Sequence, residues 1–147
     1  VIYLDKVESR QAVRMHSQIG NASPCYCTGV GKAAFSMLPD EEARRRAGTI
    51  QFVHHTATTI RDADGLMREV ADIRVKGYAL DREEQEPGIH CVAAPIRVPD
   101  RSLLAGLSVT APVYRVSMDQ MLAWVDDVRA TADAISEDLN IRLGPRG

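Results

Sequence analysis

The clearest hydrophobic pattern in the chain is a stripe of apolar residues at helical spacing near its end. The stripe consists of Met121, Leu122, Val125, Val128, Ala132, Ile135 and Leu139. Charged residues occupy the positions between them, which is typical of a helix with one face on a core and the other in water. The pattern predicts a single long amphipathic helix.

Two shorter helices are indicated earlier by their end residues. Thr28 precedes Gly29, Gly31 and a small, apolar run, so it is predicted near the N-cap of a helix with both glycines in its first turn. Pro39 followed by three acidic residues predicts the start of a second helix, which ends near Gly48.

A further helix is expected between an aspartate cap and a glycine. Asp62 or Asp64 caps it, and Gly77 closes it. Its apolar residues at helical spacing are Leu66, Val70 and Ile73.

Alternation of apolar and polar residues predicts the strands, which are residues 1–7, 12–16, 78–83, 89–98 and 103–110. The first two suit a hairpin, and the last two are expected to form a long hairpin through the centre of the sheet. Antiparallel strands interrupted by helices define an α+β domain rather than a doubly wound parallel fold.

Composition supports one ordinary globular domain. The 147 residues are 45% hydrophobic and 26% charged, which excludes a disordered tail, a collagen-like repeat and a disulfide scaffold. The net charge is -2 and the pI is about 6.1, whereas a domain that grips DNA phosphates is normally basic. This stretch by itself is therefore predicted to be a poor nucleic-acid binder.

The chain contains no apolar run long enough for a membrane span, and no membrane partner is expected. It begins with Val1 rather than Met, so we expect a fragment or processed chain that further sequence precedes. The odd count of three cysteines favours reduced thiols and a cytoplasmic location.

The glycine run at residues 28–32 is not a phosphate loop. That motif requires a glycine six positions before its lysine and Ser or Thr after it, but Tyr26 and Ala33 hold these positions around Lys32. Exposed N–H groups at the helix start could attract a small anion, or the glycines could simply allow close packing.

No metal site or catalytic centre is predicted. The candidate ligands are Cys25, Cys27, Cys91, His54 and His55, but their spacing does not suit zinc. His90 cannot act as a base for Cys91, because neighbours on a strand face opposite sides. The adjacent acids Glu83 and Glu84 are predicted to form a solvated face.

A polar spot is expected on the last strand. Ser108 and Thr110 share one face with Leu104 and Gly106. The spot is either a solvent-facing edge or the floor of a pocket, since pockets combine apolar walls with a few placed polar groups.

Four segments carry a family resemblance by their order and spacing, and they are 24–33 (PCYCTGVGKA), 76–84 (KGYALDREE), 88–96 (GIHCVAAPI) and 105–112 (AGLSVTAP). Together they resemble the C-terminal effector-binding domain of the IclR family of bacterial transcriptional regulators. The resemblance implies a GAF/PAS-like antiparallel sheet flanked by helices on both faces, spanning residues 1–147. It also implies an N-terminal winged helix-turn-helix DNA-binding domain that is absent from this chain.

The resemblance implies an effector site, formed by Met15, Gly29, Val30, Asp81, Cys91, Ser108 and Thr110. The effector would be a small organic, sugar or aromatic acid whose carboxylate is held by the N–H groups of Gly29 and Val30. Family members form dimers or tetramers, and operator DNA would be bound only through the missing domain. No cofactor is implied.

This sequence departs from the family pattern at Thr110, where Ser is common, and at Ala111, where Gly is usual before Pro112. The added methyl groups are expected to narrow the pocket or change its preference among effectors. The expected function is thus a non-catalytic ligand sensor that alters oligomer geometry. The alternatives are an oligomerisation module with a vestigial pocket and an enzyme with Cys91 as nucleophile.

Overall fold

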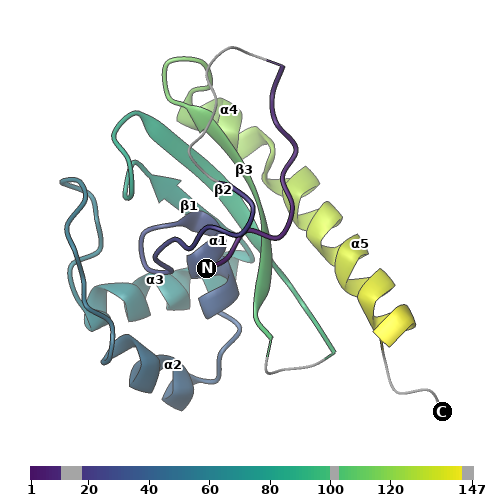
Figure 1. Cartoon of the computed structure of the whole chain (residues 1–147), viewed down its shortest axis with the longest axis horizontal. Coiled ribbons are helices and arrows are strands. Elements are labelled where there is room, and N and C mark those ends of the chain that lie inside the picture. The colour runs from purple at the N-terminus through teal and green to yellow at the C-terminus, as the bar shows by residue number, and fades with distance from the viewer. Residues whose placement is uncertain (11–17, 100–102, 144–147) are drawn as a thin grey trace.

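The computed structural model describes residues 1–10, 18–99 and 103–143. Their helices and strands are α1 (Gly29–Phe35), α2 (Asp40–Ala47), α3 (Ala63–Lys76), β1 (Ala79–Arg82), β2 (Ile89–Ile96), β3 (Ala105–Pro112), α4 (Met118–Ala123) and α5 (Val125–Leu143) (Figure 1).

The three strands form one antiparallel sheet in the order β1-β2-β3. β2 and β3 form the predicted hairpin, with Ile89 opposite Pro112 and Ile96 opposite Ala105. The prediction of a hairpin is confirmed. Among the three described strands, β2 lies at the centre and β3 at an edge.

Helices cover both faces of the sheet (Figure 1). On one face α5 and α4 bury Val92 and Ala94 of β2 against Met121 and Val128. On the other face α1 lies against all three strands, and α3 and α2 pack beyond it. The predicted α+β architecture with helices on both faces is therefore confirmed.

The predicted ends of the first three helices are confirmed. The Thr28 hydroxyl accepts a hydrogen bond from the Gly31 N–H, and the Asp62 carboxylate accepts one from the Gly65 N–H. Gly77 ends α3 in the left-handed conformation, with φ 79°, which a glycine adopts without steric cost.

The long helix predicted near the end of the chain is interrupted. Ser117 starts α4 with a capping box to Gln120, and α4 ends at Trp124 before α5 begins. Leu122 is 38% exposed, although the predicted stripe placed it on the core face. The rest of the stripe is continuous across the break, since Met121, Val125 and Val128 are all buried.

The strand predicted over residues 1–7 is wrong. These residues contain one isolated bridge, between Ile2 and Ala22, and the backbone of Val1 pairs with Ser23. A strand needs a continuous ladder with a partner, and here the pairing is limited to a few contacts with the following loop. Residues 12–16 of the predicted hairpin lie outside the described residues.

Candidate functional site

The sheet register places the predicted polar residues in two neighbouring rows. Cys91 pairs with Asp81 on one side and with Thr110 on the other, and Ala93 pairs with Ser108. Directly paired residues of antiparallel strands project to the same face. Because Val92 between them packs against α5, both rows face α1.

The first turn of α1 packs tightly onto these rows. A Cβ atom added at Gly29 would overlap Cys91 Sγ and would lie 3.6 Å from the Asp81 backbone nitrogen. Val30 approaches β3 in the same way, since a Cβ at Gly106 would lie 3.1 Å from Val30 Cγ2. The structure thus brings Gly29, Val30, Asp81 and Cys91 together. Only a residue without a side chain fits at position 29.

The first turn of a helix leaves N–H groups without intrahelical partners. Here the Thr28 side chain satisfies the Gly31 N–H, and the Thr28 carbonyl accepts from the Lys32 N–H. The N–H of Gly29 lies against the Cys91 thiol, where it favours the ionised form of the sulfur. The start of α1 therefore directs backbone dipoles toward the row that contains Asp81 and Cys91.

Asp81 is the most perturbed carboxyl group of the site. It is buried, with 6% of its surface exposed, and its Oδ1 accepts a 2.7 Å hydrogen bond from the Glu84 N–H. Burial, together with the Glu84 carboxylate, raises the pKa of Asp81 to about 6, against the lowering effects of that hydrogen bond and of Lys32. Asp81 therefore changes charge near pH 6.

We expect Asp81→Asn to stabilise the fold at pH 7 by on the order of 3 kcal/mol. Because the pKa of Asp81 is higher in the folded than in the unfolded chain, its protonated form contributes fully to the stability of the fold below about pH 4. That contribution is lost as pH rises through about 6. The amide carries no charge, yet its oxygen can still accept from the Glu84 N–H. Urea unfolding at pH 4 and pH 7 measures the difference, with Asp126→Asn, an exposed change, as the control. Equal stability of wild type and variant at pH 7 would refute this assignment.

Cys91 is not equipped to act as a nucleophile. Burial, followed by the Asp81 carboxylate, raises the pKa of its thiol to about 12, against smaller lowering effects of the Gly29 and Asp81 N–H groups. The reactive thiolate is therefore strongly disfavoured at neutral pH. His90 pairs with Ala111 in the neighbouring row, whose side chains face away from Cys91 as expected.

The hydroxyl pair on β3 lies at the open side of the rows. Ser108 is half-buried beside Ala93, and Thr110 is exposed at the end of the row that begins with Asp81. Met15, the predicted apolar cover, lies outside the described residues. The described part of the candidate site is therefore a buried polar end at Asp81 and Cys91 that continues to a more open end at Thr110.

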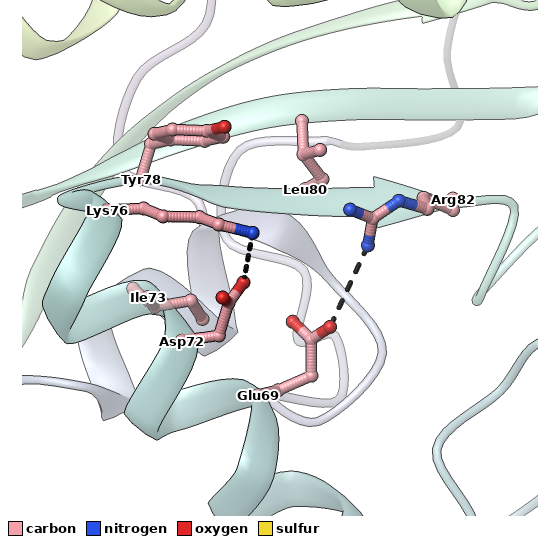
Figure 2. A pocket seen from close by; sticks show the side chains of 7 residues that line it. All are labelled: Glu69, Asp72, Ile73, Lys76, Tyr78, Leu80 and Arg82. Carbon is pink, nitrogen blue, oxygen red and sulfur yellow. Dashed lines mark hydrogen bonds and ion pairs between the residues drawn. The ribbon is translucent and has the colours of Figure 1, made fainter.

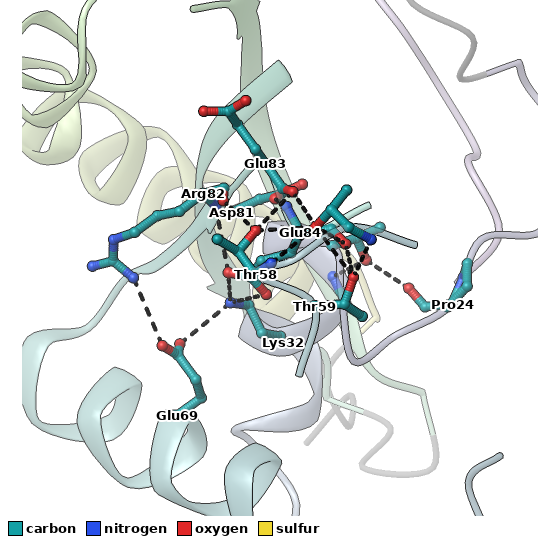
Figure 3. A network of polar contacts seen from close by, with 12 residues as sticks. Pro24, Lys32, Thr58, Thr59, Glu69, Asp81, Arg82, Glu83 and Glu84 are labelled. Atoms are coloured by element: carbon teal, nitrogen blue, oxygen red, sulfur yellow. Dashed lines mark hydrogen bonds and ion pairs between the residues drawn. The ribbon is translucent and has the colours of Figure 1, made fainter. Parts of the chain in front are cut away.

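Sequence reasoning missed a buried charge cluster next to this site (Figure 3). Lys32 Nζ is fully buried and lies 2.7 and 2.8 Å from the two carboxylate oxygens of Glu84, and 3.3 Å from Glu69. The prediction that Glu84 lies on a solvated face is wrong, because it is only 4% exposed. Its partner is 52 residues away, so no local pattern could indicate the burial.

A segment that we call the threonine loop (residues 56–59) holds the turn after β1. The hydroxyls of Thr56, Thr58 and Thr59 donate to carbonyl oxygens of residues 82–84 at 2.6–2.9 Å. Within this turn Glu83 has the left-handed φ of 58°, which is uncommon for a residue with a side chain. The density of threonines was visible in the sequence and could have indicated such backbone contacts.

Tyr3 is a second residue that the sequence did not single out. The segment before α1 returns toward the sheet, where the Gly20 N–H donates to the Tyr3 carbonyl at 2.9 Å. Burial raises the pKa of the Tyr3 phenol, a hydrogen bond with Ser23 lowers it, and Cys91, Asp81 and Cys27 raise it further. The phenol is therefore within electrostatic reach of Asp81 and Cys91.

Two cavities lie elsewhere. One, of ≈ 10 Å³, is a depression between α3 and the edge of β1, lined by Glu69, Asp72, Ile73, Lys76, Tyr78, Leu80 and Arg82 (Figure 2). The other is lined by Lys6, Glu8, Gln18 and Ile19. Neither contains a predicted site residue. The ion pair of Lys76 with Asp72 borders the first, which has room for about one water molecule.

In the described ranges, no three His, Cys, Asp or Glu residues lie where they could hold a metal ion. Within those same ranges, no helix has the length and apolar character needed to cross a membrane.

Comparison with known proteins gives one family. The family model described as "Bacterial transcriptional regulator IclR C-terminal" matches residues 1–137. The probable transcriptional regulator SauR of Cupriavidus necator is 34% identical over 133 residues, which is 90% of this chain and 53% of SauR. The transcriptional regulator KdgR of Escherichia coli is 30% identical over 95% of this chain and 53% of its own length.

Solved structures of IclR-type regulators are similar to this chain as well. The crystal structure of Thermotoga maritima IclR matches with a TM-score of 0.87 and 32% identity, over 94% of this chain and 56% of that one. The C-terminal domain of Escherichia coli KdgR matches with a TM-score of 0.75 and 28% identity, over 87% of this chain and 78% of that one.

The chain belongs to the IclR family of bacterial transcriptional regulators and corresponds to their C-terminal domain. It spans about half the length of the curated relatives it matches. Those relatives are regulators of transcription, so the protein belongs to a family that is not enzymatic, in agreement with the high pKa of the Cys91 thiol.

Proposed function

We propose that the chain is the ligand-sensing part of a transcriptional regulator and that it binds a small carboxylate-bearing effector. The observation that carries the proposal is the row of Asp81, Cys91 and Thr110, which faces the glycine-rich start of α1. The effector carboxylate would be bound by the N–H groups of Gly29 and Val30, and its polar substituents by Asp81, Ser108 and Thr110. The exposed end at Thr110 provides the route of entry.

The effector would act by shifting an equilibrium between two arrangements of a dimer or tetramer. Binding between α1 and β3 favours the arrangement in which these elements are held together, to the extent that the effector binds the two arrangements unequally. An N-terminal DNA-binding domain, outside this chain, would read the change as altered spacing on operator DNA. Small-angle scattering with and without a bound acid tests this step, which is rejected if the oligomer is unchanged.

Thermal unfolding with three acids tests the binding proposal. Pyruvate, D-gluconate and 4-hydroxybenzoate represent organic, sugar and aromatic acids. An acid at about 100 times its dissociation constant stabilises the fold by roughly 2.7 kcal/mol, which is a clear rise in the midpoint. We expect one of these classes to give that rise. We also expect Ser108→Ala to weaken the affinity about fivefold, through the loss of one hydrogen bond of about 1 kcal/mol.

Ser117→Ala is the matched control for the loss of a hydroxyl. Ser117 caps α4 on the other face of the sheet. Loss of this cap is expected to lower the free energy of unfolding by about 1 kcal/mol, and with it the thermal midpoint, but to leave the acid-induced rise of the midpoint intact. If all three acids leave the wild-type midpoint unchanged, the alternative is favoured, which is an oligomerisation module with a vestigial pocket.

A further inference from the structure

The Lys32–Glu84 ion pair connects the two elements that border the candidate site. Lys32 lies on α1, three residues after Gly29, and Glu84 lies three residues after Asp81 in the turn that follows β1. Both carboxylate oxygens of Glu84 accept from Lys32 Nζ, at 2.7 and 2.8 Å, and both side chains are buried. The pair therefore fixes the start of α1 relative to the end of β1.

Glu84 also holds Asp81 directly. Its backbone N–H donates to Asp81 Oδ1 at 2.7 Å, and its carbonyl accepts from the Thr59 hydroxyl at 2.6 Å (Figure 3). The side chain of Glu84 is thus fixed by Lys32, and its backbone by the threonine loop. The orientation of the Asp81 carboxyl depends on both contacts, because they determine where the Glu84 N–H points.

The charged and titratable groups around Asp81 come from every neighbouring element, and they are Lys32 from α1, Cys91 from β2, Glu83 and Glu84 from the turn, and Tyr3 and Cys27 from the segment before α1. Lys32 is the cation in this set. Glu69 of α3 reaches the set only through Lys32, at 3.3 Å.

We propose that Lys32 and Glu84 are positioning residues of the effector site, which hold the Asp81 carboxyl beside the effector carboxylate and thereby set how effector binding depends on pH. The inference rests on the proposed function, since it assumes an anionic effector near Gly29. A neutral Asp81 donates its O–H to the effector carboxylate, whereas an ionised Asp81 repels it. Affinity therefore falls as pH rises through the titration of Asp81, by at most tenfold per pH unit for one proton.

Two substitutions move this titration in opposite directions. Lys32→Met removes the neighbouring cation and leaves the Glu84 carboxylate, which raises the pH at which affinity falls, by about one pH unit. Glu84→Gln removes the neighbouring anion and keeps the backbone contact to Asp81, which lowers that pH. A pair with only a structural role would change stability and overall affinity but would leave the midpoint of the profile in place.

The test is the dissociation constant of pyruvate, D-gluconate or 4-hydroxybenzoate, whichever binds, measured by calorimetry at half-unit steps from pH 5 to pH 8. Lys76→Met and Glu42→Gln are the controls, because each removes one charge from an exposed ion pair remote from Asp81. The quantity compared is the pH at the midpoint of the fall in affinity. We expect both controls to keep the wild-type value, Lys32→Met to have a higher value and Glu84→Gln a lower one.

Each outcome decides between the two proposals. Binding with the same midpoint in both positioning variants overturns the role of the pair and leaves the proposed function standing. No binding of any of the three acids by wild type overturns the proposed function and the positioning role with it. If Lys32→Met does not fold, the direction of the Glu84→Gln shift decides alone, since that side chain keeps the size and one acceptor oxygen of Glu84.

Discussion

Lys32→Met is expected to destabilise the fold by about 3–5 kcal/mol, the largest effect that we predict for a single substitution. Lys32 is fully buried, and the Glu84 side chain that it pairs with is 6% exposed. Removal of the cation leaves a carboxylate in the interior, where water cannot compensate its charge. Urea unfolding at pH 7 gives the change in the free energy of unfolding.

Lys76→Met is the matched control for this prediction. Lys76 also forms a 2.7 Å ion pair, with Asp72, but both side chains are more than two-fifths exposed. Exposed pairs contribute about 0–1 kcal/mol, so this variant is expected to unfold almost like wild type. The double variant Lys32→Met with Glu84→Leu should recover part of the loss, because no buried charge remains. If Lys32→Met lost no more stability than Lys76→Met, the ion pair would not contribute as described.

Gly31→Ala is expected to cost about 3 kcal/mol of stability. A Cβ at Gly31 would lie 2.5 Å from the Cys25 carbonyl oxygen and from Thr28 Oγ1, and 2.6 Å from Cys25 Cα. Two of these atoms belong to the backbone, so the conflict can be relieved only by a movement of the segment that leads into α1. We expect the same movement to disturb the cap at Thr28. Thermal and urea unfolding measure the loss.

Gly48→Ala provides the comparison. Gly48 ends α2 with a right-handed φ of -65°, and an added Cβ would approach only carbonyl oxygens of its own helix, at 3.5 and 3.6 Å. Alanine is therefore expected to be neutral or to stabilise by up to about 1 kcal/mol through the unfolded chain. A Gly31→Ala variant as stable as Gly48→Ala would contradict the close approach between α1 and Cys25.

The features that the sequence predicted well depend on local chemistry. The caps at Thr28 and Asp62 and the glycine at the end of α3 are determined by a few neighbouring residues, and each is found where the pattern indicated it. The alternation along β3 correctly placed Gly106, Ser108 and Thr110 on one face. The glycines at the start of α1 were consistent with close packing of this helix, but the sequence did not indicate that Gly29 packs against the Cys91 thiol.

The features that the sequence could not predict depend on distant partners. Alternation over residues 1–7 suggested a strand, but a strand also requires a neighbour with a free edge. The burial of Glu84 follows from Lys32, far away in the chain, and the row from Asp81 to Thr110 follows from the register of three strands. Membership of the IclR family supplied the expectation of a pocket at this place, and the register explains which side chains would meet there.

The most direct test of the central claim is to locate the bound acid by NMR, through the amide signals of the protein during titration with the acid that raises the thermal midpoint. The account predicts that the largest changes occur at Gly29 and Val30 and at Ser108 and Thr110 on β3. Changes concentrated instead at the depression between α3 and β1, around Lys76, would contradict the assignment of the effector site to the rows that face α1.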